Sequence, residues 1–316
     1  MYCNQTGDQM KKGVYQLSIF LACIFSMSLL QGLQAQGCSD AGLCKIDVLK
    51  PDPENPLLKH DNKVNAGMYV GGADYGIMVF GGDMGYSRKF GENWSVDTKM
   101  TFLSQGGNDI SVTGLGDIFA NVNYKVSQKF ILTAGAKIPL MKADREKDGL
   151  SLPMDYQSSL GTFDLLAGIR YNPEKWQWAL AVQVPLQQND NTFFAGLYDT
   201  LSPLNDIQTT NAFKRQADIM LHVSRTIKMS DKITFTPGLL PIYHISEDEY
   251  TDIDGIQYAI KGSDGLTLNG TVFIDVKMSA TGNLEFDLGF PFIVRDARPD
   301  GLTRSFVFGV AYSYAF

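Results

Sequence analysis

The chain has 316 residues, of which 44% are hydrophobic, 11% aromatic and 19% charged. Its 34 acidic residues outnumber the 27 basic ones, which argues against a nucleic-acid-binding protein, and the sparse charge and many aromatics exclude a disordered chain. Glycine, with 31 residues, tyrosine, with 14, and phenylalanine, with 19, are all frequent, which favours strands and tight turns over helices.

Residues 1–35 have the pattern of a secretory signal peptide. Lys11 and Lys12 precede an uncharged stretch at 13–30, and Ala35 offers a small residue at a plausible cleavage point. A retained transmembrane anchor is the alternative, but serines dilute the stretch. We therefore expect these residues to be removed on export.

Residues 36–62 are predicted to form an irregular N-terminal arm, since three prolines occur between positions 51 and 56. Cys38 and Cys44 lie in this arm, and an exported chain meets an oxidising compartment, so we expect a disulfide between them. The alternative is a lipoprotein processing site in which Cys38 is acylated.

From residue 63 to 316 the chain alternates apolar and polar residues in segments of about ten, as transmembrane strands do. Within 116–126 the even-numbered residues are apolar or small, and most odd-numbered ones are polar. The same parity resumes in 130–140 after a three-residue turn at 127–129, as a hairpin requires. We expect the apolar face to point outward.

Two kinds of connection alternate along this region. Short turns are predicted at 91–93, 127–129, 172–175, 228–231 and 279–283, and longer polar stretches at 105–115, 141–158, 188–214, 246–264 and 296–303. Outer-membrane barrels show this asymmetry. Trp94, Trp176 and Trp178 follow short turns and, with Phe316, predict an aromatic girdle at one membrane interface. A soluble β-sandwich is the alternative reading of the alternation.

Counting back from the terminal Phe316 gives eleven strands, the earliest at 75–90. A bacterial barrel needs an even number, and 64–70 supplies the remaining strand. The prediction is an all-β fold: a transmembrane up-and-down antiparallel β-barrel of twelve strands, spanning residues 63–316, in the outer membrane of a Gram-negative bacterium.

Four short features, at 114–117, 137–140, 160–164 and the terminal Phe316, resemble Gram-negative outer-membrane barrels. They specifically resemble the phenol meta-pathway degradation family of transporter-like barrels, over residues 75–316. The resemblance implies passage of small, apolar or aromatic solutes and provides no catalytic residues. The expected partners are outer-membrane lipid, the small solute and the barrel-assembly machinery, which would bind the C-terminal strand.

The inward-facing polar residues are the candidates for lining the lumen. They are Asp117, Asn121, Lys137, Asp164, Arg170, Asp218, His222, Asp275, Lys277, Glu285 and Asp287. Hairpin register predicts Lys277 opposite Glu285, and Lys137 diagonal to Asp117. Such pairs either stabilise a barrel interior or select a solute. The sequence leaves open whether side chains or the arm close the lumen.

Catalytic readings are weak. His222 and His244 are predicted opposite Pro237 and Arg215, about seven residues apart, which is too far for a shared metal. The acidic segment 247–254 lacks the ligand spacing of a calcium loop. We expect no metal and no cofactor.

One pair resembles the His-x-Ser arrangement of outer-membrane lipid A deacylases. His244 and Ser246 have this spacing, with Glu247 and Glu249 nearby, but strand parity sends both inward, away from lipid. We therefore expect a non-catalytic solute-passing or solute-binding barrel. The alternatives are a closed structural or interaction barrel and, less favoured, a deacylase-type hydrolase.

Overall fold

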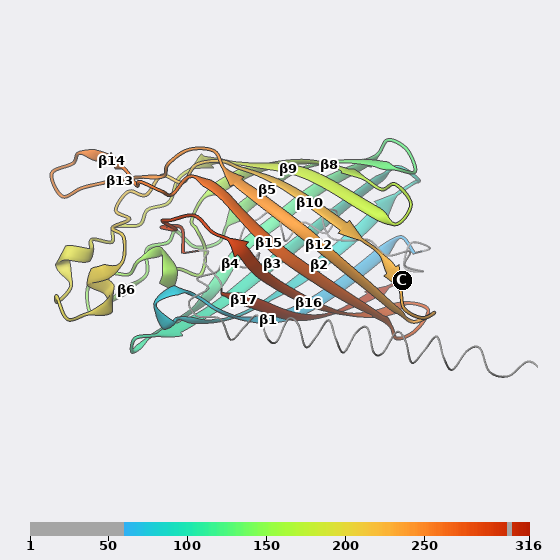
Figure 1. Ribbon diagram of the computed structural model, residues 1–316, viewed down its shortest axis with the longest axis horizontal. Helices are drawn as coiled ribbons and strands as arrows, with labels where there is room; N and C mark the ends of the chain where they lie inside the picture. Colours follow the sequence, from blue (N-terminus) through green and yellow to red (C-terminus); the bar gives the residue numbers. More distant parts are fainter. Residues whose placement is uncertain (1–59, 302–304) are drawn as a thin grey trace, which may run out of the picture. The chain divides into compact units, whose positions relative to one another are not determined.

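The computed structural model describes residues 60–301 and 305–316. By its contacts the chain divides into two units, Met1–Gln34 and Ala35–Phe316, and every described residue belongs to the second. This unit is built around one antiparallel sheet that closes on itself (Figure 1). In the described part of the chain, no helix is long and apolar enough to cross a membrane.

Twelve long strands form the barrel wall. They are β1 (Asn62–Gly72), β2 (Met78–Phe90), β3 (Trp94–Gly107), β4 (Ile110–Lys125), β5 (Phe130–Pro139), β8 (Phe163–Tyr171), β9 (Trp176–Gln187), β10 (Asp218–Arg225), β12 (Ile233–His244), β15 (Gly265–Lys277), β16 (Gly282–Ile293) and β17 (Phe306–Ala315). A two-residue strand, β11 (Ile227–Lys228), continues the pairing of β10 with β12. The predicted twelve-stranded antiparallel barrel is confirmed.

The first and last strands close the barrel. β1 pairs with β17 from Lys63 opposite Ala315 to Gly72 opposite Phe306. At the end of this seam the Asn62 N–H donates to the Phe316 carbonyl (3.1 Å), and the Phe316 N–H donates to the Asn62 carbonyl (2.9 Å). Closure therefore leaves no strand of the wall with an unpaired edge.

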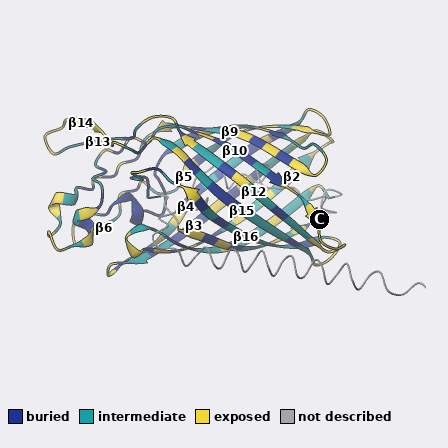
Figure 2. Cartoon of the chain, in the orientation of Figure 1, coloured by how far each residue is buried: buried dark blue, intermediate teal, exposed yellow. Residues whose placement is uncertain are grey.

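Burial alternates along the strands (Figure 2). In β5, for example, Phe130, Leu132 and Ile138 are exposed, whereas Thr133 and Lys137 are buried. Each of the twelve strands carries at least one exposed large apolar side chain. The exterior is therefore apolar, and the polar side chains of the alternating pattern point inward.

The two ends of the barrel differ. The connections at one end, which also holds the C-terminus, are short turns (Figure 1). The other end carries longer connections with small elements of their own: η4 (Asp74–Gly76), β6 (Glu146–Lys147), β7 (Leu150–Ser151), η5 (Met154–Tyr156), η6 (Ala195–Leu197), η7 (Pro203–Asp206), β13 (Glu249–Thr251) and β14 (Gln257–Ala259). We call them the turn end and the loop end.

The predicted polar stretch at 105–115 is wrong. Strands β3 and β4 run through it and are joined by Asn108 and Asp109 alone. Both residues have positive φ, 54° and 59°, as a two-residue hairpin turn requires, and Asn and Asp tolerate this conformation better than most side chains.

A β-bulge then shifts the alternation in β4. Gly116 and Asp117 together oppose Thr101, and the Asp117 N–H donates to Thr101 Oγ1 (2.8 Å). The outward position consequently changes from odd-numbered Leu115 to even-numbered Ile118. The predicted arrangement for 116–126, with even-numbered residues facing outward, thus begins at this bulge.

Candidate functional site

One connection folds into the barrel instead of lying on its surface. Residues 152–162, between β5 and β8, are buried without exception, and we call them the inward segment. Connecting segments normally lie exposed, so continuous burial requires partners for the polar groups of this one. Those partners come from the barrel wall and from neighbouring loops.

The inward segment is hydrogen-bonded to β3 and β4. Tyr156 Oη donates to the Gly107 carbonyl at 2.9 Å, and Ser159 Oγ donates to Asp117 Oδ1 at 2.5 Å. The inward segment can approach β4 this closely because Gly116 has no side chain. A Cβ at this position would lie 3.1 Å from the Ser158 carbonyl oxygen. The β-bulge at Gly116 and Asp117 is therefore also the place where the inward segment contacts β4.

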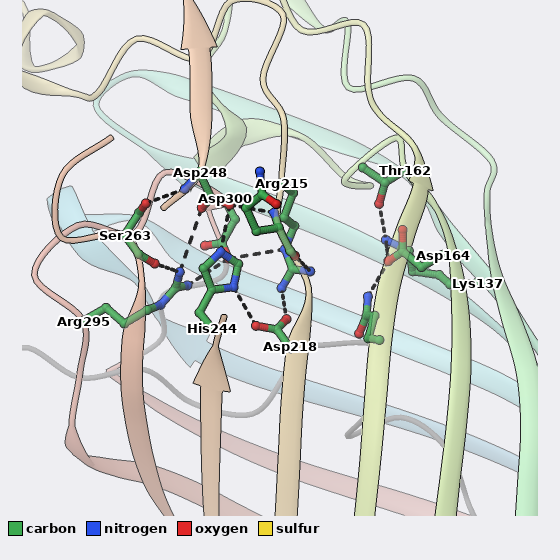
Figure 3. Close-up of polar contacts among 12 residues, drawn as sticks. Lys137, Thr162, Asp164, Arg215, Asp218, His244, Asp248, Ser263, Arg295 and Asp300 are labelled. Atoms are coloured by element: carbon green, nitrogen blue, oxygen red, sulfur yellow. Dashed lines mark hydrogen bonds and ion pairs between the residues drawn. The ribbon is translucent and has the colours of Figure 1, made fainter. Parts of the chain in front are cut away.

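A buried ion pair anchors the far end of the segment. Lys137 Nζ lies 2.9 Å from Asp164 Oδ2, and both side chains are fully buried (Figure 3). The same ammonium donates to Thr162 Oγ1 at 2.8 Å, and Gln183 donates to the Asp164 carboxylate. Since β5 and β8 pair with Lys137 opposite Asp164, the wall itself sets this geometry.

A second buried network joins β10 and β12 to the loops above them. His244 Nδ1 lies 2.7 Å from Asp218 Oδ1, and His244 Nε2 lies 2.8 Å from Asp248 Oδ1 (Figure 3). Arg215 forms an ion pair with Asp218. Asp218 is the first residue of β10 and His244 the last of β12, and the two lie at the same level because they are cross-strand partners.

Asp300 connects this network to a third loop. Arg295 Nη2 donates to Asp300 Oδ2 at 3.0 Å, and Arg215 Nε lies 3.6 Å from the same oxygen. Burial alone would raise the pKa of the Asp300 carboxyl, but the Arg295 and Arg215 guanidinium groups outweigh it and hold that pKa below its usual range. The adjacent Gly301 packs on the inward segment, where a Cβ would lie 2.5 Å from the Met154 carbonyl.

A pocket lies between the inward segment and the wall. Residues from both sides line it, among them Tyr69, Gln105, Asp117, Phe119, Gln157 and Asp300. The pocket therefore brings together the bulge of β4, the inward segment and the loop that carries Asp300.

Towards the turn end the interior is polar and hydrogen-bonded. The Asp97 carboxylate accepts from Asn121 Nδ2 (2.7 Å) and from Asn123 Nδ2 (2.6 Å). On the other side of the barrel, Asn283 Nδ2 donates to Asp275 Oδ1 at 2.9 Å. These groups belong to neighbouring strands, so they also stabilise the wall.

Most of the predicted lining residues are buried in the structure. Asp117, Asn121, Lys137, Asp164, Arg170, Asp218, His222 and Asp275 are buried, and Lys277, Glu285 and Asp287 are partly buried. The structure brings Lys137 and Asp164 together as an ion pair and places Asp275 opposite Glu285, and the other candidates are distributed over β4, β8, β10, β15 and β16. Sequence reasoning missed Arg215, Asp248, Arg295 and Asp300, because strand periodicity carries no signal for charges in loops.

One predicted cross-strand pair is wrong. Lys277 lies opposite Asn283, and Glu285 lies opposite Asp275, because the β15–β16 turn is centred one residue before the predicted centre, which shifts each partner by two residues. Lys137 is diagonal to Asp117, as predicted, since its direct partner across β4 is Phe119. Its ion pair nevertheless forms with Asp164, from the strand on its other side.

The predicted positions of the histidines are also wrong. His244 faces Asp218, not Arg215, because the turn between β10 and β12 occupies 229–232. The shift moves every partner of β12 by three residues along β10, so Pro237 is not the partner of His222.

The deacylase-like pair is not assembled. His244 is buried and both its ring nitrogens contact carboxylates, whereas Ser246 is exposed. The prediction that both side chains point inward therefore holds for His244 only. Within residues 60–301 and 305–316, no three His, Cys, Asp or Glu side chains are grouped as metal ligands.

The four residues of the predicted girdle are exposed near the turn end. Trp94 and Trp176 begin β3 and β9, Trp178 follows two residues later, and Phe316 ends the chain. The Trp94 ring lies 4.6 Å from that of Tyr124. The predicted signal peptide, most of the predicted arm, and Cys38 and Cys44 lie outside the described residues.

No family model matches the chain, and no curated protein matches it. Among solved structures, the NanC porin is similar at 9% identity over 81% of this chain and 100% of that one, with a TM-score of 0.45. The CymD monoaromatic hydrocarbon channel is similar at 10% identity over 90% and 94%, with a TM-score of 0.44. The translocator domain of autotransporter NalP from Neisseria meningitidis is similar at 10% identity over 85% and 91%, with a TM-score of 0.45.

Proposed function

We propose that this protein is a barrel of the Gram-negative outer membrane through which small solutes pass. A membrane location is supported by the apolar exterior, to which exposed side chains such as Met68, Leu132 and Phe308 contribute. A closed sheet satisfies its backbone hydrogen bonds internally, which lipid requires. The predicted signal peptide and the expected recognition of the last strand by the barrel-assembly machinery belong to the same proposal.

The observation that carries the solute-passing role is the inward segment at the loop end. A barrel of about twelve strands is wider than one of eight, whose own side chains fill it. Here residues 152–162 narrow the interior, and the wall binds their polar groups through Tyr156 and Ser159. A constriction that is fixed to the wall by hydrogen bonds limits passage to small solutes without any change in the wall itself.

The solute class and the absence of catalysis are finer parts of the proposal. The resemblance at 114–117, 137–140 and 160–164 favours small apolar or aromatic solutes. A non-catalytic role is supported by His244, whose two ring nitrogens are both held by carboxylates.

A closed structural or interaction barrel is the second candidate, and one observation favours it. Phe119, Leu166, Met220 and Leu240 form an apolar cluster with Ala179 and Ala181 inside the wall. If these side chains block the lumen, the loops would carry the function.

Swelling of liposomes that contain the purified, exported protein separates the two candidates. We would compare it with a variant lacking residues 36–61, which keeps Asn62 of β1, and with Tyr156→Ala, which removes the bond to Gly107. If the protein is a channel, we expect the unaltered protein to give swelling that depends on the sugar. We expect Tyr156→Ala to admit larger sugars than the unaltered protein does. Swelling only after deletion would assign the arm as a plug, and no swelling from any form would favour the closed barrel.

A further inference from the structure

His244 has a carboxylate on each side of its ring (Figure 3). Nδ1 lies 2.7 Å from Asp218 Oδ1, and Nε2 lies 2.8 Å from Asp248 Oδ1. The three side chains are at most 3% exposed. A carboxylate accepts hydrogen bonds and cannot donate them, and a neutral imidazole has only one N–H. Both contacts are therefore hydrogen bonds only when the ring carries two protons and a positive charge.

The neighbouring guanidinium groups keep both carboxylates ionised. Arg215 forms an ion pair with Asp218. On the other side, Arg295 Nη1 lies 3.9 Å from Asp248 Oδ2. Arg295 and Arg215 also lie 3.0 and 3.6 Å from Asp300 Oδ2. Charged groups from β10 and from the connections before β10, after β12 and after β16 therefore face the imidazole. Arginine stays protonated in proteins, so the imidazole is the group of this network that responds to alkaline pH.

Asp248 holds together the base of the connection after β12. Its N–H donates to Ser263 Oγ at 2.7 Å, and its carbonyl accepts the Ile260 N–H at 2.7 Å. These bonds close the stem from which the β13–β14 hairpin projects at the loop end (Figure 1). The Gln216 N–H donates to Asp248 Oδ1 at 2.8 Å, which joins the same carboxylate to the connection before β10. The charged ring therefore links the wall to the stem of the hairpin.

A neutral ring cannot keep both contacts. One nitrogen would present its lone pair to a carboxylate oxygen 2.7 or 2.8 Å away. Burial strengthens this repulsion, because charges are screened less inside a protein than in water. Asp218 is fixed beside His244 as its cross-strand partner in the wall, whereas Asp248 belongs to a connection. The contact that breaks on loss of a proton is therefore the one with Asp248.

We propose that His244 is a pH-dependent switch: its imidazolium fastens the β13–β14 connection to the barrel wall, and its deprotonation at alkaline pH releases that connection. The switch goes beyond the proposed function, because it concerns the loops and operates whether or not solutes pass through the barrel. It makes the arrangement of the loop end depend on a single proton.

Tryptic cleavage after Lys261 measures the release. Lys261 is exposed in the stem of the hairpin, between Ile260 and Ser263, whose bonds to Asp248 hold the stem closed. Cleavage after Lys147, which is exposed on β6 in another connection, is the internal reference. The ratio of the two rates cancels the pH dependence of trypsin itself. With the full exported chain in detergent micelles, we expect this ratio to rise about tenfold between pH 7 and pH 10, as loss of one charged hydrogen bond allows.

His244→Gln is the informative variant, because glutamine has no charge to lose. Its cleavage ratio should be raised about tenfold already at pH 7 and should change little at pH 10. His222→Gln is the matched control. His222 is also a buried histidine of the wall, but its Nε2 lies 3.0 Å from Thr271 Oγ1, away from the loop network. This control should behave as the unaltered protein does, and resistance of each barrel to SDS at room temperature verifies that the variants fold.

Nitrogen NMR of the unaltered protein, labelled at its histidines, measures the charge of the ring directly. The chain has three histidines, and the two variants assign the signals of His222 and His244. Both ring nitrogens of His244 should be protonated at pH 7, where an ordinary histidine is mostly neutral. One should lose its proton over the pH range in which the cleavage ratio rises.

Three results would overturn the switch: a neutral His244 at pH 7, a cleavage ratio in the unaltered protein that does not change with pH, or a ratio in folded His244→Gln equal to that of the unaltered protein at pH 7. Neither measurement requires solute passage. Failure of the switch therefore leaves the proposed channel standing, and failure of the channel leaves the switch testable.

Discussion

The two sides of the barrel wall share one strand pattern but differ in what they place inside. From β4 to β12 many inner side chains are large and buried, as at Lys137, Leu166 and Met220. From β16 through β17 and β1 to β2 many are small, as at Gly309 and Gly67. We call these the filled wall and the small wall.

This difference teaches that a barrel can control its lumen without changing its exterior. Both walls expose large apolar side chains, for example Leu180 on the filled wall and Phe308 on the small wall. The inward-facing positions alternate with these outward-facing ones along each strand, so the size of the inner side chains can vary independently of the outer side chains. The size of the inner side chains is therefore set strand by strand, and the filled wall supports the inward segment.

The largest expected effect comes from breaking the ion pair of the filled wall. Lys137→Met leaves the Asp164 carboxylate fully buried without its cation, which should lower the free energy of unfolding by about 3 to 5 kcal/mol. Urea-induced unfolding in lipid measures it. The double variant Lys137→Met/Asp164→Leu should recover most of the loss, and a single variant as stable as the unaltered protein would contradict the prediction.

Leu240→Ala makes the filled wall resemble the small wall. Leu240 is 2% exposed inside the apolar cluster, so truncation should lower the free energy of unfolding by about 3 kcal/mol and speed up solute passage. Its neighbour Leu239 is 50% exposed on the outer face, and Leu239→Ala is the control, expected to leave passage unchanged. Equal passage rates in both variants would show that the cluster does not limit flux.

Acid should weaken the loop network that adjoins the filled wall. Because the pKa of Asp300 is lowered on folding, its contribution is complete above the pKa of the unfolded chain, about 4, and is lost as pH falls through the lower folded value. Comparing urea unfolding of Asp300→Asn with the unaltered protein should give a difference of about 2 kcal/mol at pH 7. That difference should shrink below pH about 4, and a pH-independent difference would refute the assignment.

The smallest effect is expected on the small wall. A Cβ on Gly81 would lie 2.2 Å from Cζ of Tyr69, so the ring must turn, and Gly81→Ala should cost about 1 to 2 kcal/mol in unfolding free energy. Gly106→Ala is the control, because its nearest atom would be 3.8 Å away. If Gly81→Ala and Gly106→Ala lower the free energy of unfolding equally, the Tyr69 ring does not limit the size of the residue at position 81.

Much of the barrel could be predicted because its signals are local. Alternation in 130–140 fixes the face of each residue, and even strand number requires a strand at 64–70, which the structure has as part of β1. The turn at 108–109 was missed because the polar residues around it were interpreted as a loop, although an Asn-Asp pair is itself a turn signal.

The candidate site was harder to predict because it depends on contacts between distant segments. Burial of 152–162 follows from partners on β3, β4 and the loop of Gly301, none of which is adjacent in sequence. The partner of His244 depends on where one turn is centred, and a shift of three residues along β10 replaced Arg215 with Asp218.

The seam between β1 and β17 also constrains the order of assembly. Its terminal contact, between Asn62 and Phe316, joins residues 254 positions apart, whereas the other neighbours in the wall are closer in sequence. Until β17 is in place, β1 remains an open edge able to pair with another chain. The ring can be completed only after β17 has been synthesised, so the growing chain depends on protection of the β1 edge from aggregation.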